Sequence, residues 1–228
     1  MSDLVAYLDI LGTSDRVRAD RFDDIEISDF VNPVCLLAYH LPALRCAAFS
    51  DSVVVSAPEA EIGNFLIGLS FLYSQWMSDC VFVRCGIALG EIVWIDMGGR
   101  IDSSFKKLNN LAFARVYGKG LLKAQNIEKG SGPGAVSFLA PDIARLVRAS
   151  TTHPVLQGPV DVLVWASPRI NRMIQSLSSS AIAREDESTD AARHMIATLW
   201  YYQEMERLGL FTSPDLIPFS REVGDVVD

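Results

Sequence analysis

Two aspartates are the residues of this sequence best placed to do chemistry. The first is Asp9, in the apolar run Ala6-Tyr7-Leu8-Asp9-Ile10-Leu11-Gly12-Thr13. The apolar residues before it predict a buried strand, and a carboxylate set into such a strand is costly unless a positive group meets it. Gly12 then lets the backbone pass close to a ligand and direct N–H groups at it. A carboxylate beside such amides suits a metal ion that carries a phosphate chain.

The second aspartate is Asp51, in the segment Ala47-Ala48-Phe49-Ser50-Asp51-Ser52-Val53-Val54-Val55. This segment predicts two short strands joined by a tight Ser-Asp-Ser turn. Either aspartate alone favours an ordinary interpretation, in which Asp9 caps a turn and Asp51 occupies a hairpin tip. Two aspartates at the ends of core strands can converge on one pair of metal ions, and together they favour that interpretation.

The composition indicates one soluble domain with room for an appendage. The chain has 228 residues, half of them hydrophobic, and a net charge of −8. This charge argues against broad, non-specific binding to nucleic acid, but it does not exclude a nucleotide site. The four cysteines show no CxxC pair and no metal-ligand spacing, so we expect mostly buried free thiols in a reducing cytoplasm. The N-terminus shows no signal peptide, and the longest apolar stretches, such as 65–73, are too short to span a membrane.

The order of predicted elements is β-α-β-β-α-β, followed by additions, which is typical of a ferredoxin-like α+β core. Strands are expected over 3–10, 44–49, 52–57, 81–91 and 135–139, and residues 92–96 either continue the fourth strand or pair with it. Helices are expected over 27–40, 58–79, 117–129, 141–150, 169–179 and 188–208, the first of them broken or begun by Pro33. Edge strands are expected within 151–168. Residues 14–26 and 97–113 are expected to be solvated connections, the second carrying Lys106 and Lys107.

Four of these stretches, taken together, resemble the class III nucleotidyl cyclases. They are Asp9-Ile10-Leu11-Gly12, Phe49-Ser50-Asp51-Ser52, Arg84-Cys85-Gly86-Ile87-Ala88-Leu89-Gly90-Glu91, and Gly118 through Glu128, in the family's order and approximate spacing. The resemblance covers residues 3–140, and within the class it is strongest to the bacterial pyrimidine cyclases of antiphage Pycsar systems. It implies a cyclase catalytic core over 1–150, with strand and helix additions over 151–228 that pack on the same domain.

The resemblance also implies a two-metal mechanism. Asp9, Asp51 and the backbone carbonyl of Ile10 would hold two Mg²⁺ or Mn²⁺ ions, one activating the ribose 3′-hydroxyl and the other steadying the triphosphate. The 3′-oxygen would attack the α-phosphorus in line and expel pyrophosphate. The family works as a head-to-tail homodimer whose sites are shared between two chains. The amides that would cradle the β- and γ-phosphates belong to Leu11, Gly12 and Thr13.

The sequence departs from the family where purine cyclases read the base. Ala47 stands where they have a lysine, and Arg115 stands where adenylate cyclases have an acceptor. Leu122 and Asn126 stand where they have asparagine and arginine. The missing arginine leaves stabilisation of the transition state unassigned among Lys119, Lys123 and the segment 97–113. Asn126 either positions the ribose or α-phosphate as a catalytic residue or is an ordinary exposed helix residue.

We therefore expect a cytoplasmic uridylate cyclase that acts in antiviral defence and whose product is read by a separate effector. UTP is favoured because an arginine at 115 offers donors only, which suit the O4 and O2 acceptors of uracil. CTP is the alternative substrate, in which case Arg115 makes a surface ion pair. An inactive cyclase-like module that binds nucleotide or a partner protein is a second hypothesis. A GGDEF-type or palm-domain nucleotidyltransferase is a third, although no Gly-Gly-Asp-Glu-Phe-like hairpin is present. No nucleic acid and no membrane are expected as partners.

Overall fold

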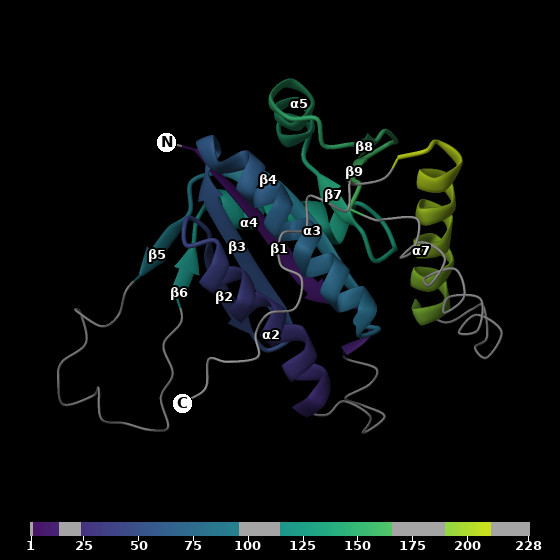
Figure 1. Ribbon diagram of the computed structural model, residues 1–228, viewed down its shortest axis with the longest axis horizontal. Helices are drawn as coiled ribbons and strands as arrows, with labels where there is room; N and C mark the ends of the chain where they lie inside the picture. Colours follow the sequence, from purple (N-terminus) through teal and green to yellow (C-terminus); the bar gives the residue numbers. More distant parts are fainter. Residues whose placement is uncertain (1, 14–23, 96–114, 166–189, 211–228) are drawn as a thin grey trace.

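A seven-stranded sheet forms the centre of the molecule (Figure 1). The computed structural model describes residues 2–13, 24–95, 115–165 and 190–210, with the backbone alone for 24–27, 115, 190 and 191. The strand order is β2-β3-β1-β4-β7-β9-β8; β4 and β7 run parallel, and the other neighbours run antiparallel. The strands are β1 (Asp3–Ile10), β2 (Arg45–Phe49), β3 (Ser52–Pro58), β4 (Val83–Gly90), β7 (Ser137–Leu139), β8 (Val155–Leu156) and β9 (Asp161–Leu163).

The first part of the chain has the ferredoxin-like order that the sequence predicts. Helix α2 (Asp24–His40) connects β1 to the β2–β3 hairpin, and helix α3 (Ile62–Ser78) connects β3 to β4. Within the sheet these strands take the order β2-β3-β1-β4, all antiparallel. Figure 1 shows α2 and α3 in front of the sheet, with α4 (Lys119–Gly130) behind it. The prediction of an α+β core is confirmed.

The strands and helices form where the apolar pattern requires them. Strand β1 is apolar on both faces because both are covered, with Leu4 and Leu8 buried on one face and Val5 on the other. Helix α3 buries one stripe that includes Phe65, Leu69 and Trp76. The Trp76 ring stacks on Phe30 of α2 at 5.1 Å, and its Nε1 donates to the Phe30 carbonyl at 2.9 Å. These contacts fix α2 against α3.

Glycines let α4 lie directly on the sheet. A Cβ at Gly86 of β4 would sit 2.1 Å from the Ala124 carbonyl oxygen and 2.4 Å from the Glu128 nitrogen. A Cβ at Gly90 would meet the Gly120 Cα at 2.6 Å. No side chain fits between these backbones, so the glycines bring α4 close to β4 and β1. As a result, the residues of α4 that face the sheet reach the end of β1.

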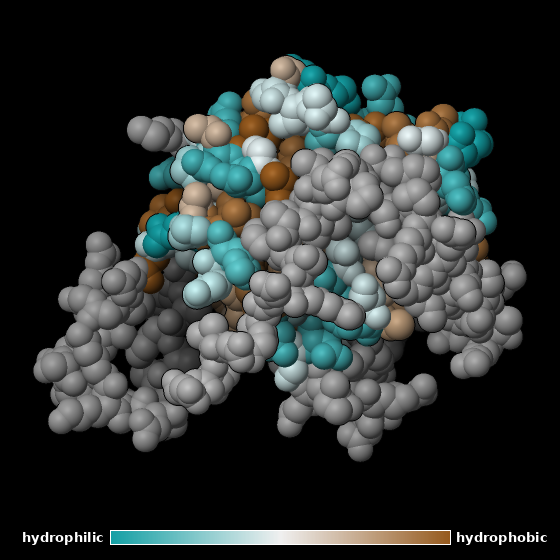
Figure 2. Space-filling view, viewed as in Figure 1, coloured by the Kyte–Doolittle hydropathy of each residue, from teal (hydrophilic) through white to brown (hydrophobic). Residues whose placement is uncertain are grey.

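The segment after β4 differs from the prediction. Val93–Ile95 (β5) neither continues β4 nor pairs with it, but forms a separate antiparallel pair with Arg115–Tyr117 (β6). The partner strand lies about twenty residues away in sequence, so no local pattern predicts it. Figure 2 shows hydrophobic residues at the surface over this pair, and Tyr117 is 55% exposed.

Later elements extend the same sheet. Helix α5 (Pro141–Ser150) has its predicted bounds, and β8 and β9 form an antiparallel pair beside β7. Helix α7 (Asp190–Arg207) is tied to the segment before β7, because the Thr198 hydroxyl accepts from the Ala135 amide at 2.8 Å and Tyr202 donates to the Ala135 carbonyl at 3.2 Å. Among the described residues, no helix is long and apolar enough to cross a membrane.

Several predicted details need correction. Helix α2 begins at Asp24 and runs through Pro33 without a break, and residues 59–61 form a separate 3₁₀ turn before α3. Pro33 lies inside this helix, where its ring removes one backbone hydrogen-bond donor. Of the four cysteines, Cys85 is buried and Cys46 partly so, whereas Cys35 and Cys80 are exposed. The expected helix over 169–179 and the segment 97–113, with Lys106 and Lys107, lie outside the described residues, as does most of the connection 14–26.

Candidate active site

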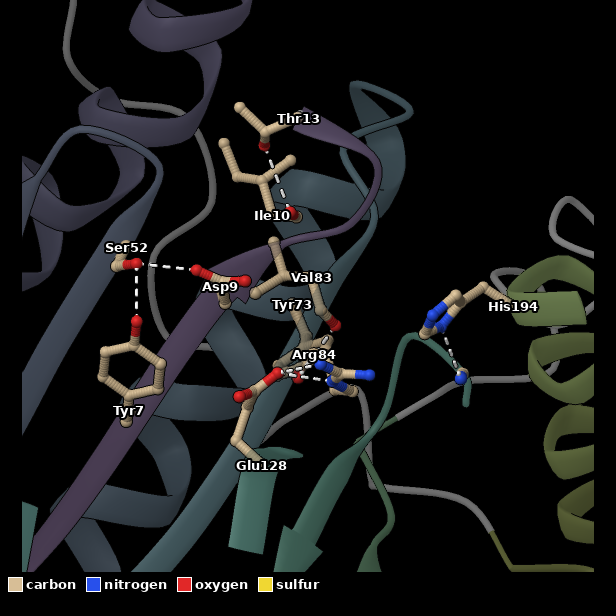
Figure 3. Close-up of polar contacts among 11 residues, drawn as sticks. Tyr7, Asp9, Ile10, Thr13, Ser52, Tyr73, Val83, Arg84, Glu128 and His194 are labelled. Atoms are coloured by element: carbon tan, nitrogen blue, oxygen red, sulfur yellow. Dashed lines mark hydrogen bonds and ion pairs between the residues drawn. The ribbon is translucent and has the colours of Figure 1, made fainter. Parts of the chain in front are cut away.

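Asp9 lies in the middle of a row of polar side chains across three strands (Figure 3). In the sheet register, Asp9 of β1 is opposite Ser52 of β3 on one side and Arg84 of β4 on the other. Residues opposite one another in an antiparallel sheet point to the same face, here the face covered by α4. The Ser52 hydroxyl donates to Oδ1 of Asp9 at 2.6 Å. The Asp9 carboxylate therefore lies on the face of the sheet that α4 covers, near the end of β1.

The β2–β3 turn brings Asp51 to the same place. Ser50 adopts a left-handed backbone conformation, with φ of 54°, which closes the turn tightly. The Asp51 carbonyl accepts a hydrogen bond from the Ile10 amide at 3.0 Å. Asp51, far from Asp9 and Ile10 in sequence, is thus adjacent to both at one end of β1. These are the three residues predicted to hold metal ions.

The charges at this point favour a bound cation. Burial raises the pKa of the Asp9 carboxyl above its usual value, and the nearby Asp51 carboxylate raises that pKa further. The Ser52 hydrogen bond and the charge of Arg84 act in the opposite direction on the same pKa. Two carboxylates held together in a partly buried place repel each other, and a divalent cation between them would relieve both the repulsion and the burial cost.

The available donors fit Mg²⁺ or Mn²⁺. Two carboxylates and one backbone carbonyl supply oxygen atoms only, and hard divalent cations prefer such a set. The Ile10 carbonyl accepts from the Thr13 hydroxyl at 3.2 Å, and its second lone pair remains for an ion. In the described part of the chain, no group of three or more His, Cys, Asp or Glu side chains forms a metal cluster. Two carboxylates and one carbonyl cannot fill the octahedral coordination of two such ions, so positions would remain for substrate oxygens.

The loop after β1 contributes fewer amides than the sequence predicts. The Leu11 amide donates to the Phe82 carbonyl at 2.9 Å, so it belongs to the sheet and is not directed at a ligand. This part of the expected phosphate cradle is corrected. Gly12 has φ of +78°, a conformation that favours glycine. The amides of Gly12 and Thr13 remain as candidates for phosphate contacts.

An ion pair beside Asp9 was missed as a functional feature of the sequence. Nε and Nη2 of Arg84 both donate to Oε1 of Glu128, whose side chain is 1% exposed (Figure 3). Burial raises the pKa of Glu128, and the charge and hydrogen bond of Arg84 act against this rise. The pair fixes a guanidinium next to the Asp9 carboxylate. A charged residue alternating with glycine in an otherwise apolar strand was the available signal.

The structure does not bring Asn126 to Asp9. Gly120, Ala124 and Glu128 form the buried stripe of α4, and Asn126 is exposed on another side of the helix. Asn126 instead lines a surface cavity of about 460 Å³ together with Lys123 and Arg145. The Lys123 amine donates to the Leu89 carbonyl at 3.2 Å. Leu89 lies at the far end of β4 from Arg84, the residue that pairs with Asp9. A second copy of the chain is needed if Asn126 is to meet an aspartate pair.

The two predicted base-reading positions lie on different strands. Arg115 is the first residue of β6 and is paired with Ile95, and its side chain lies outside the described residues. Ala47 lies on β2 opposite Val54. Neither position belongs to the row that contains Asp9. The structure therefore leaves the reading of the base as a prediction.

Comparisons with known proteins find likeness in structure alone. No protein-family model matches the sequence, and no curated protein matches it either. A bacterial light-regulated adenylyl cyclase superposes with a TM-score of 0.52 at 14% identity, over 77% of this chain and 56% of that one. The guanylyl cyclase Cya2 gives a TM-score of 0.49 at 12% identity, over 72% and 90% of the two chains. The adenylyl cyclase CyaB from P. aeruginosa gives 0.48 at 13%, over 73% and 95%. The first likeness shows that this chain has the mixed α+β fold of a nucleotidyl cyclase domain.

Proposed function

We propose that this protein is a nucleotidyl cyclase that converts UTP to 3′,5′-cyclic UMP and pyrophosphate. One observation carries the proposal: Asp9, the Ile10 backbone and Asp51 meet at the end of the central strand, beside the guanidinium of Arg84. The mixed α+β fold of a nucleotidyl cyclase domain supports the proposal. The reaction is an in-line attack of the ribose 3′-oxygen on the α-phosphorus.

The residues of this site have separate tasks. The carboxylates of Asp9 and Asp51 and the carbonyl of Ile10 bind the ions. Two bound Mg²⁺ or Mn²⁺ ions supply Lewis-acid activation of the 3′-hydroxyl and neutralise charge on the phosphates. Gly12 and Thr13 direct backbone amides toward the triphosphate, since a turn of this kind forms an anion-binding concavity.

A homodimer with shared sites is part of the proposal. Asn126 lies away from the aspartates of its own chain, so its contribution to catalysis requires a second copy. Around Asn126, the cavity between α4 and α5 also presents Lys123 and Arg145. In the proposed homodimer, these cations would neutralise a triphosphate bound to the aspartates of the partner. We assign to them the stabilising charge that the sequence lacks at Asn126. Asp142 also lines the cavity, and its Oδ1 accepts from the Ile143 amide at 2.9 Å.

The pyrimidine preference rests on two sequence positions. Arg115 offers hydrogen-bond donors only, which match O4 and O2 of uracil, whereas cytosine presents an amino donor in place of O4. With CTP, the Arg115 donors would face the amino donor of cytosine, and both would be left without acceptors. This would cost about 1–3 kcal/mol, or one to two powers of ten in selectivity. CTP is the alternative substrate. By the resemblance to antiphage pyrimidine cyclases, the product is a signal read by a separate effector in the cytoplasm.

An inactive module that binds nucleotide is the second candidate function. Leu122 and Asn126 occupy the positions of the asparagine and arginine that cyclases of this class use, and Leu122 is 59% exposed. A chain that has lost catalysis would bind a triphosphate and metal without turnover. The retention of Asp9 and Asp51 opposes this candidate, because a binding module needs no pair of metal-binding carboxylates.

The first experiment is incubation of the purified protein with all four nucleoside triphosphates and Mn²⁺, with products identified by mass spectrometry. Cyclic UMP is expected in the parent. Asp9→Asn and Asp51→Asn are each expected to lower the rate by at least ~100-fold, as removal of a major electrostatic stabiliser does. Asp3→Asn is the matched control, because Asp3 lies at the other end of the same strand. Nucleotide binding without any cyclic product would support the inactive module.

A comparison of kcat/KM for UTP and CTP tests the reading of the base. The parent is expected to prefer UTP, and Arg115→Ala is expected to reduce the UTP/CTP ratio. A parent that prefers CTP would overturn the assignment of substrate. An unchanged ratio in Arg115→Ala would overturn the role of Arg115 but leave the cyclase assignment intact.

A further inference from the structure

A chain of three side chains leads from the interior of the sheet to the Asp9 carboxylate. The Tyr7 hydroxyl lies 2.8 Å from Oγ of Ser52, and Oγ of Ser52 lies 2.6 Å from Oδ1 of Asp9 (Figure 3). Tyr7 and Asp9 are two residues apart on β1, and Ser52 is the first residue of β3, directly opposite Asp9. All three side chains point to the face covered by α4. Ser52 is 8% exposed, so water has little access to its hydroxyl.

The direction of these hydrogen bonds follows from their chemistry. An ionised carboxylate accepts only, so Ser52 must donate its single proton to Asp9. Its oxygen can then only accept from Tyr7, and the chain runs from the Tyr7 hydroxyl through Ser52 to Oδ1 of Asp9. Among the residues that the structure describes, Oδ2 of Asp9 has no hydrogen-bond partner. One carboxylate oxygen is therefore fixed by the sheet, and the other is presented to a ligand.

We propose that Tyr7 and Ser52 are positioning residues that hold Asp9 as a one-oxygen ligand and thereby set the preference of the site for Mg²⁺. The inference rests on the proposed function, in which Asp9 binds the ions. Mg²⁺ demands near-ideal octahedral geometry, so it needs ligands that do not rotate. A carboxylate fixed through one oxygen meets this demand. An Asp9 freed from Ser52 can rotate and present both oxygens to one ion, which a larger and more tolerant ion such as Mn²⁺ accepts better.

The contribution of each residue differs. Ser52 donates directly to Asp9, the residue that would bind the metal. Loss of a group that hydrogen-bonds a metal-binding residue typically costs about 10–100-fold in metal affinity. Tyr7 touches only Ser52, so its effect passes through the serine. Removal of the Tyr7 hydroxyl takes away the donor that orients Ser52 but leaves the Ser52–Asp9 hydrogen bond, so a smaller loss follows. With Ser52 already removed, Tyr7 has nothing to orient.

The test is direct titration of full-length protein with Mn²⁺, followed by displacement with Mg²⁺, by electron paramagnetic resonance and without nucleotide. Ser52→Ala is expected to weaken Mn²⁺ binding by about 10-fold and Mg²⁺ binding by a larger factor. Tyr7→Phe is expected to weaken Mg²⁺ binding by a few-fold, and Ser52→Thr, which keeps the hydroxyl, to restore most of the affinity. Tyr7→Phe in the Ser52→Ala background should add nothing. Tyr73→Phe is the control, because the Tyr73 hydroxyl donates to the Val83 carbonyl at 3.1 Å and takes no part in the hydrogen bonds of Tyr7, Ser52 and Asp9.

The outcomes separate this inference from the proposed function. Metal affinities in Ser52→Ala and Tyr7→Phe that equal those of the parent would overturn the positioning role, even in an active cyclase. Equal losses for Mn²⁺ and Mg²⁺ would overturn the claim about metal preference. A parent that binds Mn²⁺ but makes no cyclic nucleotide would overturn the proposed cyclase. The metal affinities of Ser52→Ala and Tyr7→Phe would then still decide whether these residues position Asp9. If Ser52→Ala does not fold, Tyr7→Phe carries the test, because it removes a single oxygen.

Discussion

At the scale of single residues, the end of β1 gathers charges that no short stretch of sequence contains. Asp9 is met by Arg84 from one neighbouring strand and by the turn of Asp51 from the other. Arg84 is in turn held by Glu128 of α4. Each of these groups would be costly to bury alone, and the pairings offset that cost. The site is therefore supported by its own counter-charges as well as by any ion it binds.

The Arg84–Glu128 pair is expected to contribute strongly to stability. Arg84→Met would leave the Glu128 carboxylate, whose side chain is 1% exposed, without its partner. We expect the free energy of unfolding to fall by about 3 kcal/mol, at the lower end for a broken buried pair because Arg84 itself is partly exposed. Urea denaturation at neutral pH measures the change. Arg84→Met combined with Glu128→Leu should recover much of the loss, and an unchanged midpoint in Arg84→Met alone would contradict the expectation.

At the scale of elements, the contact between α4 and the sheet determines which residues of the helix can act within one chain. The Gly86–Ala124 approach leaves no space for a side chain, so α4 is held in one position on β4. The buried stripe then points Glu128 to the site, and Asn126 lies on the outer side. The close packing therefore determines that Glu128 faces Arg84 and that Asn126 does not.

Gly86→Ala is expected to lift α4 from the sheet. Its Cβ would lie 2.1 Å from the Ala124 carbonyl, and a backbone atom cannot move aside as a side chain can. We expect a loss of about 3 kcal/mol, at the upper end for overpacking. The control is Gly63→Ala, because a Cβ at this position of α3 meets nothing within 4 Å. In a helix that change should be neutral or stabilising by up to about 1 kcal/mol. Thermal melts of both variants measure the change in stability. A melting temperature of Gly86→Ala equal to that of Gly63→Ala would contradict the expectation.

The cavity between α4 and α5 is expected to act on a partner's substrate. Arg145→Gln should lower kcat by about 10-fold, less than the loss of a sole stabilising group, because Lys123 shares the cavity. Arg148→Gln on the same helix is the control, since Arg148 is paired with Asp161 at 2.7 Å and does not line the cavity. Steady-state kinetics of both variants provide the measurement. Equal effects of the two substitutions would argue against a role for Arg145 in the reaction.

At the scale of the whole molecule, the fold separates the aspartates from the other predicted catalytic residue. The aspartates lie at the end of β1, whereas Asn126 lies on the outer side of α4 and Arg115 begins β6, outside the main sheet. If Asn126 and Arg115 act in the reaction as proposed, they cannot meet the aspartates of their own chain. The proposed head-to-tail homodimer would supply them from a second copy.

Mixing two impaired variants tests this arrangement. Asp51→Asn is expected to be nearly inactive alone and Arg115→Ala to be impaired with UTP by about one to two powers of ten, because each substitution damages every site of its own homodimer. Mixed dimers contain one site in which both halves are intact, so some activity should return on mixing. Activity assays over a range of mixing ratios give the measurement. Absence of recovery, or an active parent that sediments strictly as a monomer, would contradict a shared site.

The sequence by itself determined the local elements and the positions of the two aspartates. The strand over 3–10, the helix over 141–150 and the hairpin around Asp51 are where the apolar pattern places them, because period and turn residues act over short distances. The order of elements also predicted the antiparallel core.

Only the tertiary structure decided what depends on contacts between distant segments. It showed that β5 pairs with β6 rather than β4, and that the Leu11 amide belongs to the sheet. It also showed that Ser52, itself hydrogen-bonded to Tyr7, donates to one oxygen of Asp9. Strand register and the distance between helix and sheet set the positions of these groups. Both arise from packing over the whole core rather than from any local stretch of residues.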